Sequence, residues 1–263
     1  MPTPPPRPTD SAAPADWLLN RLDGGAPWVR GHVGPGFESY ARVLHPLDDG
    51  PDRPTWADVA ATNSRLLHPS AQWEQISHPA PYKPHPYQRA GRGYPGDPHI
   101  GQLTEQALGA LCDVLQPHTP PDQTCYFAVW EGWGGLGGPS YRSVVQSTPT
   151  GDPVRPVAYA PDDWQLDMGG PTFHLPGRSY HLFGGALHEA LRIGYWVTSD
   201  WFSTQSPNLL WPANHGWCVA TEIDFDSTLV GGSAELIEDL IASRGLEVLA
   251  IDPDAPYADE INN

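Results

Sequence analysis

The stretch WPANHGWCVATEIDFDSTLVGGS, residues 211–233, decides the fold, because it joins an apolar strand to a turn and to the start of a helix. Residues 217–225 predict a central or near-central strand. The glycine pair 231–232 predicts a turn, and Ser233 can cap a helix over residues 234–243. The strand also carries the reactive side chains of this region, so its geometry bears on function as well as on fold.

Short elements are expected on both sides of this stretch. The apolar run CYFAVW, residues 125–130, is typical of a buried strand, and residues 103–115 have the apolar spacing of a helix that a threonine caps. Thr55 and Asp58 form the pattern of a capping box at the start of another helix. Further strands are expected over residues 37–44, 153–159, 172–175, 178–183 and 246–251, and further helices over residues 16–22 and 185–193.

The strands and helices do not alternate regularly, and no glycine-rich phosphate loop is present. With 32 prolines and 27 glycines, the chain is expected to contain many turns and no long helical architecture. These features favour an α+β fold, a single domain over residues 15–263 with a mainly antiparallel sheet, short helices and long Pro/Gly-rich loops. Residues 1–14 predict a disordered tail. Residues 77–98 predict a long loop, either a surface excursion or a lid or partner-binding segment.

The composition is strongly acidic, since 14 Lys and Arg against 31 Asp and Glu give a formal net charge of -17. Such a charge repels phosphate backbones and anionic lipids, so neither nucleic acid nor a membrane is expected as a partner. The acidity serves solubility, or it forms a surface that meets a basic partner protein. The start of the chain lacks a secretory signal, and the 3 cysteines suggest no disulfide framework. A soluble, cytoplasmic protein is therefore expected, and its oligomeric state is not indicated.

Metal and nucleophile patterns are weak. The 11 histidines include no His-Glu-x-x-His pair, and no Cys-x-x-Cys pair occurs, so neither a metal nor another cofactor is expected. Cys218 follows His215, but three residues along an extended strand span about 10 Å, too far for the two side chains to meet. Cys218 is therefore expected to be an inert buried thiol. The sequence also lacks the Gly-x-Ser-x-Gly elbow of serine hydrolases.

Carboxylates and tryptophans supply the candidate contacts. Strand geometry would place Glu222, Asp224 and Asp226 on one face, where they form either a solvated surface, a divalent-cation site or an acid–base pair. Several of the 11 tryptophans lie beside Gly, Asp or Pro in expected loops, and they either fill the core or stack on ligands and partners. The candidate ligand or partner contacts are Glu131, Trp133, Trp201, Trp211, His215, Glu222 and Asp224.

Four runs of the chain resemble the shared segments of a family of uncharacterised actinobacterial proteins. These runs are GFESYARVLHP (36–46), CYFAVWEGWG (125–134), SPNLLWP (206–212) and WCVATEIDFDSTLVGGS (217–233). The resemblance spans most of residues 35–250, and it implies a bacterial cytosolic origin and a single folding unit. No activity, cofactor or catalytic residue comes with it, so function has to be argued from the residues themselves.

Two functional hypotheses follow. The first is a soluble acidic interaction protein, for example an immunity-like or regulatory partner that presents an acidic surface and aromatic anchors to a basic protein. The alternative is an enzyme or small-ligand binder, with a cleft lined by tryptophans and by carboxylates such as Glu131, Glu222 and Asp224. The hypotheses differ in whether tryptophans and carboxylates meet in a concave site or spread over a surface.

Overall fold

The computed structural model describes residues 5–22, 27–47, 54–78, 97–136, 166–198 and 201–256. Within these residues, nine strands form one sheet in the order β1-β5-β3-β8-β9-β10-β2-β11, and β4 shares one edge of β5 with β1. All of its neighbouring strands run antiparallel. The strands are β1 (Arg7–Pro8), β2 (Ser39–Leu44), β3 (Cys125–Trp130), β4 (Thr172–Leu175), β5 (Arg178–Gly185), β8 (Leu209–Pro212), β9 (Cys218–Ala220), β10 (Ser227–Gly232) and β11 (Glu247–Ala250). The predicted α+β fold with a mainly antiparallel sheet is therefore confirmed.

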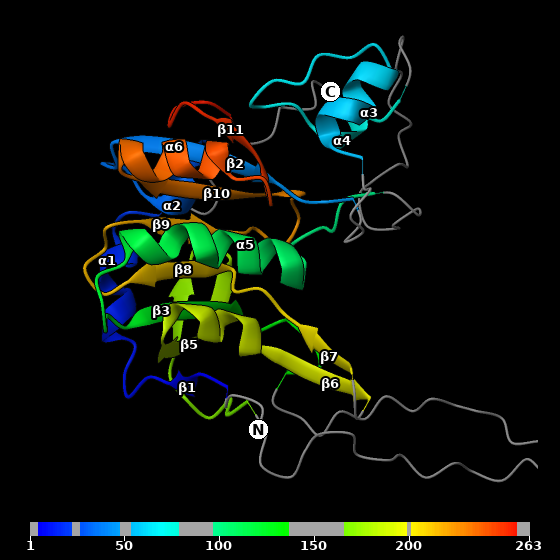
Figure 1. Ribbon diagram of the computed structural model, residues 1–263. Coiled ribbons are helices and arrows are strands. Elements are labelled where there is room, and N and C mark those ends of the chain that lie inside the picture. Colours follow the sequence, from blue (N-terminus) through cyan, green and yellow to red (C-terminus); the bar gives the residue numbers. More distant parts are fainter. Residues whose placement is uncertain are drawn as a thin grey trace, which may run out of the picture.

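Helices cover both faces of this sheet (Figure 1). We call one face the helix face, because it packs against α5 (Glu105–Leu115), α6 (Ala234–Ala242) and the 3-10 helix η3 (Leu187–Arg192). We call the other face the pocket face, and it carries α1 (Asp16–Leu19) and α2 (Val29–Val33). The sheet is thus the middle of three layers.

Smaller elements flank the sheet (Figure 1). Helices α3 (Trp56–Thr62) and α4 (Trp73–Ile76) form a separate apolar cluster beside the edge made by β2 and β11. Strands β6 (Gly194–Thr198) and β7 (Trp201–Thr204) pair only with each other within the described residues. Two further 3-10 turns are η1 (Ala13–Ala15) and η2 (Gln116–His118).

Two apolar cores follow from the alternation of side chains along each strand. In β3, Phe127 and Val129 join the core of the helix face, whereas Ala128 joins the core of the pocket face. Burial on both faces also accounts for Cys218 on β9. This residue is fully buried, and it lies in the core of the pocket face together with Ala220. Burial raises the pKa of the Cys218 thiol to about 12, so this thiol is protonated at neutral pH, in agreement with the expected inert thiol.

The stretch that decides the fold differs from its prediction in two places. The strand predicted over 217–225 ends at Ala220, because the chain turns at the following residues, where the amide of Phe225 donates to the carbonyl of Glu222 at 3.2 Å. The glycine pair 231–232 is the end of β10 and not a turn. A Cβ added at Gly231 would lie 2.4 Å from the ring of Phe37, so this position has room only for glycine.

Several local predictions agree with the structure. Ser233 caps α6, Thr104 caps α5, and Thr55 with Asp58 forms a complete capping box at α3. The predicted strands at 125–130 and 172–175 match β3 and β4. The helix predicted at 185–193 is a 3-10 helix over Leu187–Arg192. The first residue of the predicted range, Gly185, still belongs to β5. The helix predicted at 16–22 ends at residue 19.

Part of the N-terminal segment that was expected to be disordered joins the sheet. Arg7 and Pro8, inside the predicted tail, pair with Gly184 and Phe183 of β5, so this part of the segment belongs to the sheet. The backbone hydrogen-bonding groups of the β5 edge explain the pairing, since an apolar side chain is not needed to add a short edge strand. Most of the loop predicted over 77–98, and the strand predicted over 153–159, lie outside the described residues.

Candidate functional site

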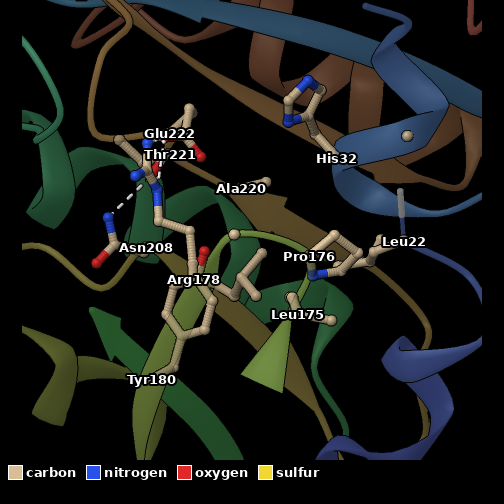
Figure 2. Close-up of a pocket in the computed structure, with 13 residues that line it drawn as sticks. Leu22, His32, Leu175, Pro176, Arg178, Tyr180, Asn208, Ala220, Thr221 and Glu222 are labelled. Carbon is tan, nitrogen blue, oxygen red and sulfur yellow. Dashed lines mark hydrogen bonds and ion pairs between the residues drawn. The ribbon is translucent and has the colours of Figure 1, made fainter. Parts of the chain in front are cut away.

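A pocket of about 430 Å³ opens on the pocket face (Figure 2). Its floor is lined by residues of β5, β8 and β9, and one wall is formed by α2. The strand register brings the floor together: Tyr180 pairs with Trp130 across β5 and β3, and Leu209 pairs with Ala220 across β8 and β9. The volume lies within the range of pockets that hold small organic molecules.

The turn between β4 and β5 forms a second wall and positions Arg178. Pro176 and Gly177 occupy the two central positions of this tight turn, with Gly177 at φ 79°. Proline fixes the first torsion and glycine accepts the left-handed one, as in a type II turn. Arg178, the first residue of β5, therefore lies at the mouth of the pocket.

Arg178 gathers two of the predicted carboxylates. Its Nη2 donates to Glu222 Oε1 at 2.6 Å and to Asp224 Oδ2 at 2.9 Å, and its Nε donates to Glu222 Oε1 at 3.2 Å. The guanidinium also lies 5.5 Å from the ring centre of Trp130. Burial opposes the charge, but Glu222 and Asp224 outweigh it and raise the pKa of Arg178 above its ordinary value. One cation and two carboxylates thus leave this corner with a formal charge of about -1.

Asn208 ties together the strand ends beneath the pocket. Its Oδ1 accepts from the amide of Trp130 at 2.8 Å and from the indole N–H of Trp133 at 3.0 Å. Its Nδ2 donates to the carbonyl of Thr221 at 3.0 Å, and its own carbonyl accepts from the Thr221 amide at 2.7 Å. A single buried amide therefore links β3, β8 and the segment after β9, and it holds the floor of the pocket rigid.

Tyr180 is a buried side chain whose hydroxyl has no hydrogen-bond partner among the residues that the structure describes. The side chain is 6% exposed, lines the pocket and stacks on Phe173 with ring centres 5.4 Å apart. Figure 2 shows its ring rising from β5 toward Arg178. Within the described residues, neither the Tyr180 hydroxyl nor Oε2 of Glu222 makes a hydrogen bond. Burial, reinforced by Glu222, raises the pKa of Tyr180, so the phenol stays neutral and can donate.

The rest of the lining is mostly aliphatic. Leu22, Leu175, Leu209 and Ala220 contribute apolar side chains, and His32 of α2 lies at the opposite rim from Glu222 (Figure 2). The pocket therefore has a polar corner and an aliphatic wall. Such a division is typical of sites that bind small organic molecules.

Four of the seven predicted contacts lie at or beside this site. Glu222 and Asp224 meet through Arg178, and Trp133 bonds to Asn208. Glu131 follows β3, and its amide donates to the carbonyl of Ser179 at 2.9 Å while its side chain is exposed. Asp226, which strand geometry placed with Glu222 and Asp224, instead turns to the buried Arg42 because the strand ends before it.

The other three predicted contacts lie apart from it. Trp211 is 0% exposed and packs against Trp17 in the core of the pocket face. His215, in the turn between β8 and β9, stacks on Trp17 at 4.3 Å. Trp201 is 57% exposed on β7, the strand that pairs with β6. None of Trp133, Trp201 and Trp211 lines the described pocket: Trp133 packs against the core of the helix face, Trp211 lies in the core of the pocket face, and Trp201 lies on β7.

Sequence reasoning missed Arg178, Tyr180 and Asn208. Arg178 and Tyr180 belong to a predicted strand, and the Pro-Gly pair before it signals a turn, but nothing local marks Glu222 as the partner of Arg178, 44 residues away. Asn208 lies in the run SPNLLWP, where an asparagine next to a buried strand signals a side chain that bonds to backbone.

The described residues contain no group of three or more His, Cys, Asp and Glu arranged to hold a metal ion. The same part of the chain has no helix with the length and apolar character needed to cross a bilayer. The described part of the chain also keeps His215 and Cys218 apart, since His215 stacks on Trp17 while the Cys218 thiol is buried.

Comparisons of the chain with protein-family models, with curated proteins and with solved structures returned no match. The chemistry of the pocket therefore carries the functional argument.

Proposed function

We propose that this protein binds a small organic molecule in the pocket lined by β5, β8, β9 and α2. The observation that carries the proposal is Tyr180, a side chain 6% exposed that lines the pocket together with Glu222 and whose hydroxyl makes no hydrogen bond among the described residues. A molecule bound in the pocket would supply hydrogen-bond partners to both the Tyr180 hydroxyl and the second carboxylate oxygen of Glu222.

The rigidity of the polar corner supports the proposal. Arg178 is held by three hydrogen bonds to carboxylates, and Asn208 bonds to three neighbouring segments. These contacts fix the polar groups before a ligand arrives, so binding does not have to order them. The proposal is a form of the small-ligand hypothesis, with its polar residues drawn from β5 and from the loop after β9.

A variant that fills the pocket tests the proposal. Ala220→Leu would place a larger side chain on the pocket floor, whereas Ala242→Leu makes the same change on the exposed end of α6 and serves as the control. We expect compounds from a library of small metabolites that raise the melting temperature of the wild type and of Ala242→Leu, but not of Ala220→Leu. If no compound stabilises the wild type, or if Ala220→Leu responds equally, the proposal fails.

A second candidate function is binding of a basic protein, as an immunity-like or regulatory partner. It is favoured by the negative charge of the helices that cover the helix face, because α5, α6 and η3 carry six carboxylates and one arginine. Two of the carboxylates pair with histidines, Asp239 with His118 at 2.8 Å and Asp113 with His188 at 2.9 Å. The remaining carboxylates are Glu105, Glu189, Glu235 and Glu238.

Charge reversal tests this second candidate. A triple variant with Glu105, Glu235 and Glu238 changed to Lys should abolish capture of a basic protein that the wild type retains from a cell lysate. A triple variant with Asp10, Glu74 and Glu131 changed to Lys alters the net charge equally at sites away from the helix face, and it should retain that protein. Equal loss in both variants would mean that only net charge matters, and it would refute a specific surface.

A further inference from the structure

We infer that the pocket takes a primary aliphatic amine, with its ammonium group between Glu222 and Tyr180 and its chain along the aliphatic wall. The inference rests on the proposed function and adds the chemical class of the ligand to it. Three observations carry it: the charge of the polar corner, the atoms left free there, and the nature of the remaining lining.

The charge of the corner selects against anions and in favour of cations. Arg178 is the only cationic side chain among the residues that line the described pocket, apart from the titratable His32. Its guanidinium is already paired with two carboxylates, at 2.6 and 2.9 Å. An anionic ligand would have to compete with both carboxylates for Arg178, whereas a cation adds the missing positive charge. The net charge of -17 adds a long-range attraction for cations.

The free atoms match an ammonium group. Oε2 of Glu222 is a carboxylate oxygen and can only accept hydrogen bonds at neutral pH. The Tyr180 oxygen can accept one bond while its proton is donated elsewhere. An ammonium group carries three N–H donors and no acceptor, so it can donate to both oxygens at once. Glu222 is well shielded, with its side chain 16% exposed, and its interactions are therefore less screened than those of Asp224, which is 75% exposed.

The lining selects the body of the ligand. Leu22, Leu175, Leu209 and Ala220 offer an aliphatic surface, and the one aromatic ring in the lining other than His32, that of Tyr180, already stacks on Phe173. Among these lining residues, a flat aromatic ligand or a sugar ring would find no tryptophan and no second tyrosine on which to stack. An alkyl chain needs only apolar surface, and the wall supplies it.

Three probes of equal chain length separate charge from apolar burial: hexylamine, hexanol and hexanoate. Each is titrated into the protein at neutral pH and fixed ionic strength, and amide chemical shifts in NMR spectra report the affinity and the site. We expect hexylamine to bind at least ten times more tightly than hexanol, and hexanoate to bind less tightly than either. The shifts should centre on Tyr180, Leu209 and Glu222.

Two matched variants locate the preference. Glu222→Gln keeps the shape of the side chain and removes its charge, so hexylamine should lose its tenfold advantage over hexanol. Asp224→Asn removes the exposed carboxylate of the same Arg178 pair and should keep most of that advantage. Tyr180→Phe, which keeps the ring, should weaken hexylamine several-fold and serves as an independent variant if Glu222→Gln does not fold.

The outcomes distinguish the ligand class from the binding function. Equal affinity for hexylamine and hexanol, both lost in Ala220→Leu, would overturn the amine class while the pocket remained a binding site. Hexylamine binding that persists in Glu222→Gln and in Ala220→Leu would show nonspecific attraction to an acidic protein, and it would overturn the inference. If none of the three probes binds, the amine class is also refuted, and the metabolite screen decides the binding function separately.

Discussion

His45 makes the stability of this protein dependent on pH in a way that a single substitution can remove. The imidazole is completely buried, with Nδ1 2.6 Å from the carbonyl of His99 and Nε2 2.9 Å from the hydroxyl of Thr228. The carbonyl can only accept, so Nδ1 carries the proton and Nε2 accepts from Thr228. Burial lowers the pKa of His45 to about 3, from an ordinary value of 6.5.

The sign of the effect follows from proton linkage. Because the folded-state pKa is lowered, the unfolded chain binds a proton near pH 6.5 that the folded protein does not bind until about pH 3. The stabilisation from His45 is therefore complete above pH 6.5 and is lost as the pH falls toward 3. At about 1.4 kcal/mol per pKa unit, the free energy of unfolding should fall by about 2 kcal/mol between pH 7 and pH 5 from this residue alone.

Denaturant unfolding of matched variants isolates this contribution from that of the many carboxylates. His45→Asn keeps a donor toward the His99 carbonyl but has no titrating ring, and His174→Asn is the control because His174 is exposed. The free-energy difference between the wild type and His45→Asn should shrink by about 2 kcal/mol from pH 7 to pH 5, whereas that for His174→Asn stays constant. Parallel curves for the wild type and His45→Asn would refute the assignment of a buried, neutral imidazole.

Two other substitutions probe the buried architecture. Asp226→Ala leaves the guanidinium of Arg42 buried without its carboxylate, 3.1 Å away in the wild type, and should lower the free energy of unfolding by about 3–5 kcal/mol in denaturant titrations; a loss below about 1 kcal/mol would contradict a structural ion pair. Trp211→Ala removes a side chain that is 0% exposed and should cost about 3–5 kcal/mol, whereas Trp201→Ala, at a position 57% exposed, should change stability by less than about 0.5 kcal/mol. Comparable losses for the two tryptophans would mean that Trp201 is not a surface residue.

The elements predictable from sequence are those whose cause is local. CYFAVW carries enough apolar surface to form a strand in a sheet whose two faces are both buried. The bounds of β3 agree with the prediction. The capping groups of Thr55, Thr104 and Ser233 act within four residues, so their sequence pattern is sufficient to fix where α3, α5 and α6 begin.

The site was less predictable because its contacts are distant in sequence. Glu222 and Asp224 were among the predicted contacts, and the structure brings them together, but not on the shared strand face that was expected, because the strand ends at Ala220. They meet because both bond to Arg178, 44 and 46 residues earlier in the chain. Trp211 was a candidate contact for which burial in the core was the stated alternative, and strand β8 buries it completely. Composition cannot separate these cases, because burial depends on which strands become neighbours.

The early end of β9 explains how a fold with two well-packed cores also acquires a polar pocket. A strand that continued to Phe225 would have kept Glu222 within the sheet, whereas the loop after Ala220 carries it to the pocket mouth. Backbone contacts replace the missing strand pairing at several points along this loop. The amide of Gly101 donates to the Phe225 carbonyl at 2.8 Å, and the amide of His45 donates to the Asp226 carbonyl at 3.0 Å.

Buried polar side chains complete the support of the same loop. The hydroxyls of Thr221 and Thr228 lie 2.8 Å apart, and Thr228 in turn bonds to the buried His45. The chain of bonds therefore runs from the imidazole to Thr221, which lines the pocket and directly precedes Glu222. Because each of these groups is buried and paired, the loop cannot move without breaking them, and each lost bond costs about 1–3 kcal/mol. The buried hydrogen bonds of the neighbouring residues thus fix the position of Glu222. A carboxylate that is held in place can distinguish ligands by their charge.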